Sequence, residues 1–210
     1  MANGNSRPLV MIPSLITIGN AVCGFVALTY IAGVHIAEGE ADNLDNLGKA
    51  AWLIMLGMVF DVFDGRVARV TGSTSNLGAQ LDSLADLVTF GLAPAGLMVT
   101  LNRTVLISEP WGKVVWVFGL AYFLGAMLRL ARFNVEHDPS EEGHLCFRGL
   151  PTPPAAGTVA GLVLVYFWLD HWKSWELRSL IAAAPEWVEA GKTWIPRVLP
   201  FFAFLLGYAM

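Results

Sequence analysis

Six long apolar segments constrain this chain more than any other feature, because together they occupy most of its length. The segments cover residues 13–37, 47–70, 78–101, 112–134, 153–172 and 194–210. Each is close to the roughly 20 residues that a helix needs to cross the hydrocarbon core of a bilayer. The sequence therefore predicts an all-α integral membrane protein with about six transmembrane helices in one bundle.

The amino-acid composition indicates the same environment. Hydrophobic residues make up 55% of the chain and charged residues 14%, whereas about a quarter of a soluble domain is charged. Short polar segments at 38–46, 71–77 and 135–148 separate the apolar ones. We expect a single membrane domain over residues 1–210 without a second, soluble domain. The sequence has no basic run that would bind nucleic acid.

The first and last apolar segments differ from the others in how they begin or end. The first apolar segment is about twice as long as the hydrophobic region of a signal peptide and lacks a clear cleavage site, so we expect a retained helix. The last segment reaches Met210 after 17 residues without a polar tail, and we expect the natural chain to continue. Residues 173–193 are expected to form a surface segment with a short interfacial helix near its tryptophans.

Four aspartates interrupt the second and third apolar segments. Asp61 and Asp64 are three residues apart, and Asp82 and Asp86 are four apart, so each pair lies on one face of a helix. The short connection 71–77 makes the two helices antiparallel neighbours whose faces can meet. Ionisable residues at membrane depth are costly and usually functional. These carboxylates are therefore the candidate site.

Divalent cations would resolve the repulsion among four converging carboxylates, whose unpaired burial is unfavourable. Oxygen ligands suit Mg²⁺, Mn²⁺ or Ca²⁺ rather than zinc, and a pair of such ions is suited to phosphoryl chemistry. Gly65, Ala68 and Gly78 would let a phosphate or sugar approach the backbone, and Arg69 offers a forked phosphate donor. The alternative is that the aspartates are solvated helix caps or partners of Arg66 and Arg69.

The spacing of these residues resembles a family signature. The pattern D-x-x-D-G-x-x-A-R-x8-G-x-x-x-D-x-x-x-D is matched without a gap between Asp61 and Asp86, and it is similar to the signature of the CDP-alcohol phosphotransferases. The resemblance implies six core transmembrane helices, usually in a homodimer. It also implies transfer of a phosphatidyl group from CDP-diacylglycerol to an alcohol with release of CMP, or of a phosphoalcohol from its CDP form to a lipid.

The resemblance also implies a role for each matched residue. Asp61, Asp64 and Asp82 would be metal ligands, and Asp86 would complete a site for two divalent cations, Mg²⁺ or Mn²⁺, and act as the general base. The CMP pocket would be lined by Gly65, Ala68, Arg69 and Gly78.

Three further stretches are similar to the phosphatidylserine synthase branch of this family. They are QLDSLADLVTFGLAPA at 80–95, RLARFN at 129–134 and FRGLPTPPAA at 147–156. The resemblance runs from Pro13 to the end of the chain, and in that branch the last helix typically continues beyond the equivalent of Met210. Ser14 departs from the pattern, because many relatives have asparagine there. The branch implies L-serine as the acceptor alcohol.

Binding of serine would require a cation for its carboxylate near the metal site. Arg129 and Arg132 are three residues apart and could supply a guanidinium, with Asn134 and Thr152 as further candidates. The alternatives are an interfacial anchor or lipid-phosphate contact for the arginines, a helix cap for Asn134, and a purely structural turn around Thr152.

Two other functions remain open from the sequence. The same chemistry could use glycerol 3-phosphate, an inositol phosphate or choline, although a phosphorylated acceptor would call for a denser basic cluster. A transporter using the aspartates as an ion path would need polar residues along several helices to the far side.

The orientation in the membrane does not follow from charge counts. An N-terminus in the cytoplasm places six basic residues inside and seven outside, so the positive-inside rule does not decide. We expect a multi-pass protein of the cytoplasmic (inner) membrane, surrounded by membrane lipids. Its N-terminus and its aspartates would face the cytoplasm, where nucleotide substrates occur.

Overall fold

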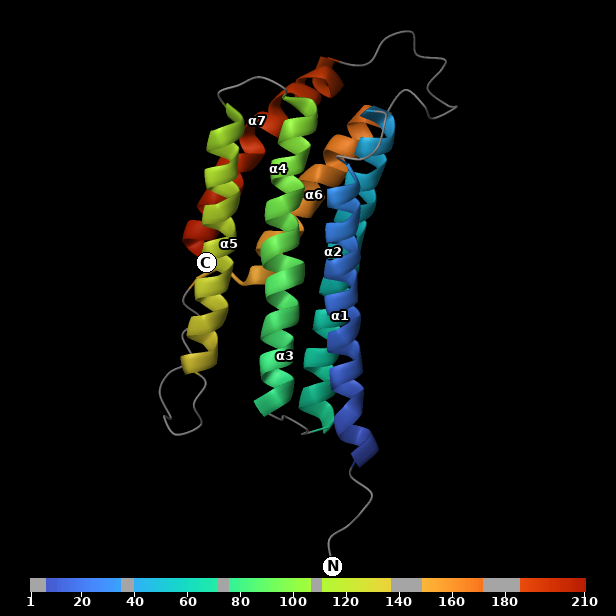
Figure 1. Ribbon diagram of the computed structural model, residues 1–210, viewed down its shortest axis with the longest axis vertical. Helices are drawn as coiled ribbons and strands as arrows, with labels where there is room; N and C mark the ends of the chain where they lie inside the picture. The colour runs from blue at the N-terminus through green and yellow to red at the C-terminus, as the bar shows by residue number, and fades with distance from the viewer. Residues whose placement is uncertain (1–6, 35–39, 72–75, 107–110, 137–148, 172–185) are drawn as a thin grey trace, which may run out of the picture.

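A computed structural model of the chain describes residues 7–34, 40–71, 76–106, 111–136, 149–171 and 186–210. These residues form a bundle of long helices with no strand among them, which confirms the predicted all-α class (Figure 1). The elements are α1 (Arg7–Gly33), α2 (Glu40–Thr71), α3 (Asn76–Asp86), η1 (Leu87–Leu92), α4 (Ala93–Val105), α5 (Trp111–Glu136), α6 (Thr152–Asp170) and α7 (Glu186–Ala209).

Five segments of the described chain are long and apolar enough to cross a membrane. They are Leu15–Gly33, Asn43–Val67, Leu77–Val105, Gly112–Asn134 and Thr152–Asp170. The third combines α3, η1 and α4 into one continuous rod. These spans coincide with the first five predicted segments and confirm a multi-pass membrane bundle.

The sixth predicted segment differs from the expectation. Residues 194–209 are helical, but they belong to α7, which already begins at Glu186 and is not among the spans that meet the criterion of length and apolarity. Its first turns carry Glu186, Glu189 and Lys192, which lower its apolarity. Residues 186–193, which were expected to lie in a surface segment with a short helix, form the mostly exposed first turns of α7, whereas residues 172–185 lie outside the described chain.

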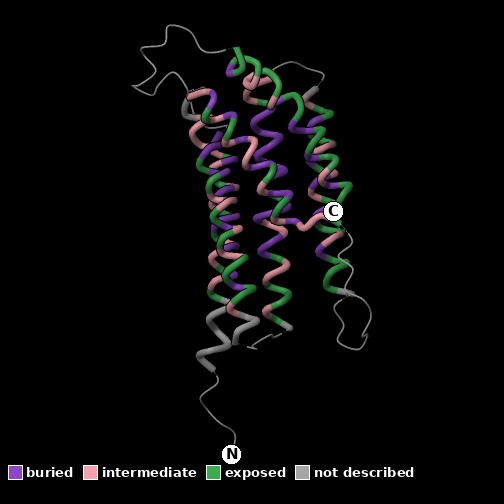
Figure 2. Tube along the Cα trace, turned by 180° about the vertical axis from the view of Figure 1, so that it is seen from behind, coloured by how far each residue is buried: buried purple, intermediate pink, exposed green. Residues whose placement is uncertain are grey.

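The outer and inner sides of the helices differ in side-chain size. Large apolar side chains point outward, including Phe25 on α1, Trp52 on α2 and Leu128 on α5, as expected for a surface in contact with lipid. Figure 2 shows the buried residues along the sides where the helices face one another. Many of these are alanines, and small residues allow the close backbone approach on which helix packing in membranes depends. The bundle therefore has large apolar side chains facing the lipid and small side chains in its interior.

The third span contains a π-helical segment, η1, which starts directly after Asp86. Such segments are rare and often lie at functional sites. The Tyr122 hydroxyl of α5 donates a hydrogen bond to the carbonyl oxygen of Phe90 at 3.0 Å, and the Thr89 hydroxyl donates to the carbonyl oxygen of Asn20 at 3.0 Å. Neighbouring helices therefore anchor the irregular segment on two sides.

A second irregularity lies in α7, which contains Pro196 and Pro200. Pro200 has no N–H group, so the carbonyl four residues earlier, that of Pro196, loses its helical partner. The side-chain amide of buried Asn102 on α4 donates to this carbonyl oxygen at 2.7 Å. A polar side chain thus satisfies the backbone group that the proline leaves free, as bilayer-spanning structures require.

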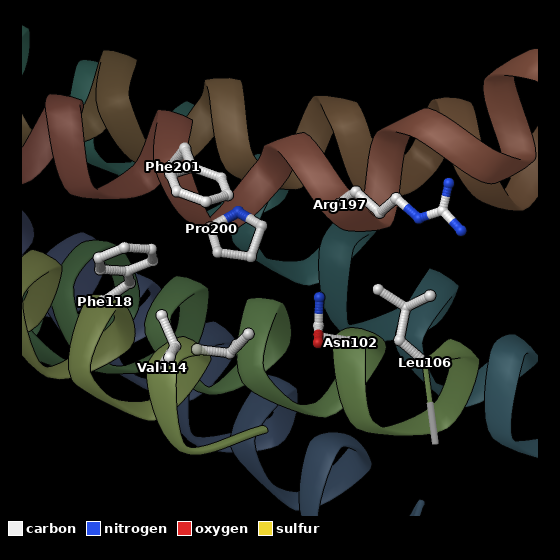
Figure 3. A pocket seen from close by; sticks show the side chains of 8 residues that line it. Asn102, Leu106, Val114, Phe118, Arg197, Pro200 and Phe201 are labelled. Carbon is white, nitrogen blue, oxygen red and sulfur yellow. The ribbon is translucent and has the colours of Figure 1, made fainter. Parts of the chain in front are cut away.

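A cavity of about 290 Å³ adjoins this contact between α4, α5 and α7 (Figure 3). Its lining is mainly apolar and consists of Asn102, Leu106, Val114, Val115, Phe118, Arg197, Pro200 and Phe201. Asn102 follows Asp86 by 16 residues, which corresponds to roughly 24 Å along a helix. The cavity is therefore separate from the aspartates.

Candidate metal centre

Three of the four aspartates converge. One carboxylate oxygen from each of Asp61, Asp64 and Asp82 lies within 4.8 Å of the others. Asp64 is buried, and the other two are half-buried. Because Mg²⁺ and Ca²⁺ bind oxygen at roughly 2.0–2.6 Å, two ligands on one ion are at most about 5 Å apart. The three oxygens are therefore close enough to share a cation.

The helices are arranged differently from a simple antiparallel pair. Helix α1 packs against both α2 and α3, whereas the backbones of α2 and α3 make few close approaches to each other. The carboxylates meet because Asp61 and Asp64 extend from α2 toward Asp82 on α3. The predicted convergence of the two aspartate faces is thus present, with α1 as the common support.

Asp86 stands apart from this group. It is not part of the three-carboxylate set, and it lies one helical turn, about 6 Å, beyond Asp82 along the rod. Its side chain is buried, and the side-chain amide of Asn20 donates to its Oδ1 at 2.9 Å. The fourth aspartate is therefore held deeper in the bundle than the other three.

The unsatisfied oxygen of Asp82 provides an independent indication of a cation. Its Oδ1 is buried and has no hydrogen-bond partner among the described residues. An unpaired carboxylate oxygen at membrane depth is strongly unfavourable. A divalent cation would compensate it, and an all-oxygen ligand set fits Mg²⁺, Mn²⁺ or Ca²⁺.

The residues expected at the nucleotide lie beside these carboxylates along the chain. Gly65 follows Asp64 at an exposed position, and a Cβ atom there would meet nothing within 4 Å, so space is open at this point. Gly78 is half-buried one turn before Asp82. Ala68 and Arg69 belong to α2, but the described structure does not extend to their side chains.

Two of the acceptor candidates contact each other. The Arg129 guanidinium on α5 donates through Nη1 to the hydroxyl of Thr152 at 3.2 Å, and Thr152 is buried at the start of α6. Arg129 also interacts electrostatically with Asp86. Its buried Nε has no hydrogen-bond partner among the described residues. The structure therefore brings Arg129, Thr152 and Asp86 to one region.

The other two acceptor candidates lie nearer the surface. Asn134 is exposed near the end of α5, and its side-chain oxygen accepts a hydrogen bond at 3.0 Å from the hydroxyl of Ser83, the neighbour of Asp82 on α3. Arg132 is exposed on the same helix. The contact of Asn134 with α3 gives it a role in packing besides any role at the site.

Comparison with known proteins identifies the family. A family model described as CDP-alcohol phosphatidyltransferase matches residues 10–193. The chain belongs to this family. The match confirms the resemblance drawn from the aspartate motif, and it includes α1 as well as the segments that carry Arg129 and Thr152. The family depends on divalent metal in general, in agreement with an aspartate cluster that could hold one.

Curated relatives named CDP-diacylglycerol–serine O-phosphatidyltransferase are similar over much of the chain. The one from Bacillus subtilis (strain 168) is 36% identical over 154 residues, which are 73% of this chain and 73% of the relative. The one from Helicobacter pylori (strain J99) is 31% identical over 159 residues, 76% of this chain and 60% of the relative. A Saccharomyces cerevisiae relative is 40% identical over 120 residues. The chain thus spans 60% of the length of the Helicobacter pylori relative.

The contribution of α1 to the aspartate site was not predicted from the sequence. Thr17 donates a hydrogen bond to Oδ2 of Asp64 at 3.0 Å, and Asn20 donates to Asp86. A signal was present, because Thr17 and Asn20 are polar residues three apart, hence on one face, in an apolar helix. Their partners on α2 and α3 could be identified only from the packing of the three helices.

Proposed function

We propose that this protein transfers the phosphatidyl group of CDP-diacylglycerol to the hydroxyl of L-serine, giving phosphatidylserine and CMP. The convergence of Asp61, Asp64 and Asp82, with an unsatisfied Asp82 oxygen, carries the proposal. The activity for which the curated relatives are named supports serine as the acceptor.

The reaction proceeds by direct attack. The serine hydroxyl oxygen forms a bond to the phosphorus that carries diacylglycerol, the bond from that phosphorus to the bridging oxygen breaks, and CMP leaves with the electron pair. Asp86 accepts the hydroxyl proton, since a buried carboxylate held in place by Asn20 is positioned for general base catalysis. No covalent enzyme intermediate is required.

Two divalent cations, Mg²⁺ or Mn²⁺, would be held by Asp61, Asp64, Asp82 and Asp86 and would supply charge neutralisation for the diphosphate and polarisation of the acceptor hydroxyl. The protein contributes ligands from two helices and orients them from α1. Thr17 fixes Asp64 by donating to one of its oxygens, which limits the orientations that the ligand can adopt.

The nucleotide lies against Gly65, Ala68, Arg69 and Gly78. The open space beside Gly65 supports a close approach of CMP to the backbone, and Arg69 contributes a forked donor for its phosphate.

Serine is bound on the α5 side of the site. Arg129 offers its unpaired Nε to the serine carboxylate, and its contact with the Thr152 hydroxyl holds the guanidinium at the start of α6. Arg132 and Asn134 provide further polar contacts at the entrance. Arg129 is near enough to Asp86 for their charges to interact, which supports binding of serine on this side of the site.

The site faces the cytoplasm, where CDP-linked substrates and serine are available, so the N-terminus is cytoplasmic and the bundle lies in the inner membrane. A homodimer surrounded by membrane lipids is the assembly we propose from the family. The transporter alternative is disfavoured, because Phe90, Leu97, Met98 and Leu101 bury apolar side chains along the rod beyond the aspartates.

A panel of acceptors tests the proposal. Purified protein is incubated with labelled CDP-diacylglycerol and Mg²⁺ or Mn²⁺, and CMP release is followed with serine, glycerol 3-phosphate, an inositol phosphate or choline. We expect CMP release with serine but not with the other three acceptors, and no CMP release after chelation of the metal. CMP release with another alcohol but not with serine would show that the other alcohol is the acceptor. Failure with every alcohol would overturn the enzymatic function.

A further inference from the structure

Asn20 connects the candidate general base to the π-helical segment that follows it. The residue is fully buried in α1, and its side-chain amide donates to Oδ1 of Asp86 at 2.9 Å. Its backbone carbonyl accepts the hydrogen bond from the Thr89 hydroxyl at 3.0 Å. Asn20 therefore contacts the last residue of α3, Asp86, and the third residue of η1, Thr89, so it binds both sides of the α3–η1 junction.

Two glycines make this arrangement possible. A Cβ atom on Gly24 would collide with the Thr89 hydroxyl and lie 3.0 Å from the Thr89 backbone. A Cβ atom on Gly57 of α2 would lie 2.6 Å from the Thr89 methyl group and 3.0 Å from Oδ1 of Asn20. Any larger side chain at either position would push Thr89 or Asn20 away, so the packing fixes both residues.

The side-chain oxygen of Asn20 shows that the amide is arranged for Asp86. Only the NH₂ group can donate to a carboxylate, so its orientation follows from that contact. The amide oxygen is then left buried without a partner among the described residues, which is unfavourable. Folding alone would not favour a buried amide with one unsatisfied atom at this position.

We infer that Asn20 is a positioning residue for the proposed transfer, and that Thr89 with the π-helical segment holds Asn20 in place. Asn20 occupies one oxygen of Asp86 and leaves the other to receive the acceptor proton. It acts through Asp86 and contacts no substrate. This inference rests on the proposed function, and it differs from the role of Thr17, which supports the metal ligand Asp64.

The kinetic test compares Asn20→Ala with the wild-type protein in the serine reaction. We expect kcat to fall by about 10², the loss typical of a misplacement near 1 Å. The KM for CDP-diacylglycerol should change less than about threefold, and the half-saturating Mn²⁺ concentration should rise much less than in Asp82→Asn, because Asp61, Asp64 and Asp82 keep their contacts.

Asn102→Ala is the matched control. Asn102 is also a buried asparagine that donates to a neighbouring helix, but it does so at the far end of the bundle. This variant should lower the thermal stability and leave kcat unchanged at a temperature where the protein is folded. An Asn20→Ala kcat within twofold of wild type would overturn the inference, as would an equal loss in Asn102→Ala.

A second pair of variants applies if Asn20→Ala does not fold. Thr89→Val keeps the size and branching of the side chain but removes the hydroxyl, whereas Thr89→Ser keeps the hydroxyl. We expect Thr89→Val to reduce kcat about tenfold and Thr89→Ser to retain most of it. Equal kcat values in the two variants would contradict the inference.

Infrared spectroscopy separates this inference from the proposed function, because it needs no turnover. The carboxylate stretching band of Asp86 is assigned by its loss in Asp86→Asn, and it should shift in Asn20→Ala but not in Asn102→Ala. A shifted band in a protein that releases no CMP would support the Asn20 contact while the proposed function fails. An unshifted band would overturn the contact even if serine transfer is observed.

Discussion

The two ends of the bundle treat buried polar groups differently. At the end of the bundle that contains Asn102, the Pro196 carbonyl lacks a helical donor because Pro200 has no N–H group. The side-chain amide of Asn102 donates to this carbonyl instead. At the aspartate end, Asn20, Asp82 and Arg129 each keep a buried atom that has no hydrogen-bond partner in the described part of the chain.

The distribution of these unsatisfied atoms is informative. Among the described residues four buried side-chain atoms have no hydrogen-bond partner; one belongs to Asp82, and two belong to Asn20 and Arg129, which interact with Asp86. The fourth, Oδ1 of Asn43, lies near the start of α2. Unsatisfied polar groups are costly in a membrane, so their concentration at one end indicates a site built for ligands rather than for stability.

The largest expected effect concerns Asp86. Asp86→Asn keeps the size of the side chain but removes the proton acceptor, so turnover should fall by at least about 10³, within the range attributed to general base catalysis. Stabilisation by CMP in a thermal melt should persist. Loss of that stabilisation in the variant would argue against the separate role of Asp86.

A smaller effect is expected when a metal ligand is altered. Asp82→Asn removes the charge whose oxygen is unsatisfied in the structure, and the half-saturating Mn²⁺ concentration should rise by more than about 100-fold. Thr17→Val, which removes only the support of Asp64, should raise it by about tenfold. Titrating Mn²⁺ against initial rates measures both, and equal values for Asp82→Asn and wild type would exclude Asp82 as a ligand.

The acceptor pocket should respond through KM. Arg129→Ala and Arg132→Ala should raise the KM for serine by about tenfold, the value of one charge-assisted contact of about 1.5 kcal/mol, with a smaller change for CDP-diacylglycerol. Lys113→Ala, at an exposed position near the start of α5, is the control. If neither variant changes the KM for serine, neither arginine belongs to the acceptor pocket.

The smallest effect on activity is expected at the far end. Asn102→Ala leaves the Pro196 carbonyl without its donor, which should cost about 1–3 kcal/mol of unfolding free energy and leave serine transfer unchanged. Thermal denaturation monitored in detergent, together with the initial rate, tests this. A large loss of activity in the folded variant would show that the two ends are not independent.

Much of the fold follows from the sequence because a bilayer restricts the possible structures. Apolar length alone located the five spans, and the spacing of Asp61, Asp64 and Asp82 indicated their convergence. The ends of the helices follow less directly from the sequence. Helix α2 begins at Glu40 rather than at residue 47, because its polar first turns continue the helix beyond the apolar segment.

The remaining features depend on contacts between distant segments. Leu87–Leu92 is as apolar as a regular helix, so no pattern distinguishes its π-helical geometry, which Tyr122 and Asn20 stabilise from other helices. The polar face of α1 was visible in the sequence, but its partners were not. The contact of Arg129 with Thr152 similarly joins α5 and α6, whose packing does not follow from the number of residues between them.

The most direct test of the central claim follows labelled serine into the lipid fraction at saturating Mn²⁺. The account predicts one phosphatidylserine formed for each CMP released by the wild-type protein, with neither product after metal chelation or in Asp86→Asn. Undiminished transfer in Asp86→Asn, or no transfer by folded wild-type protein that binds Mn²⁺, would contradict it.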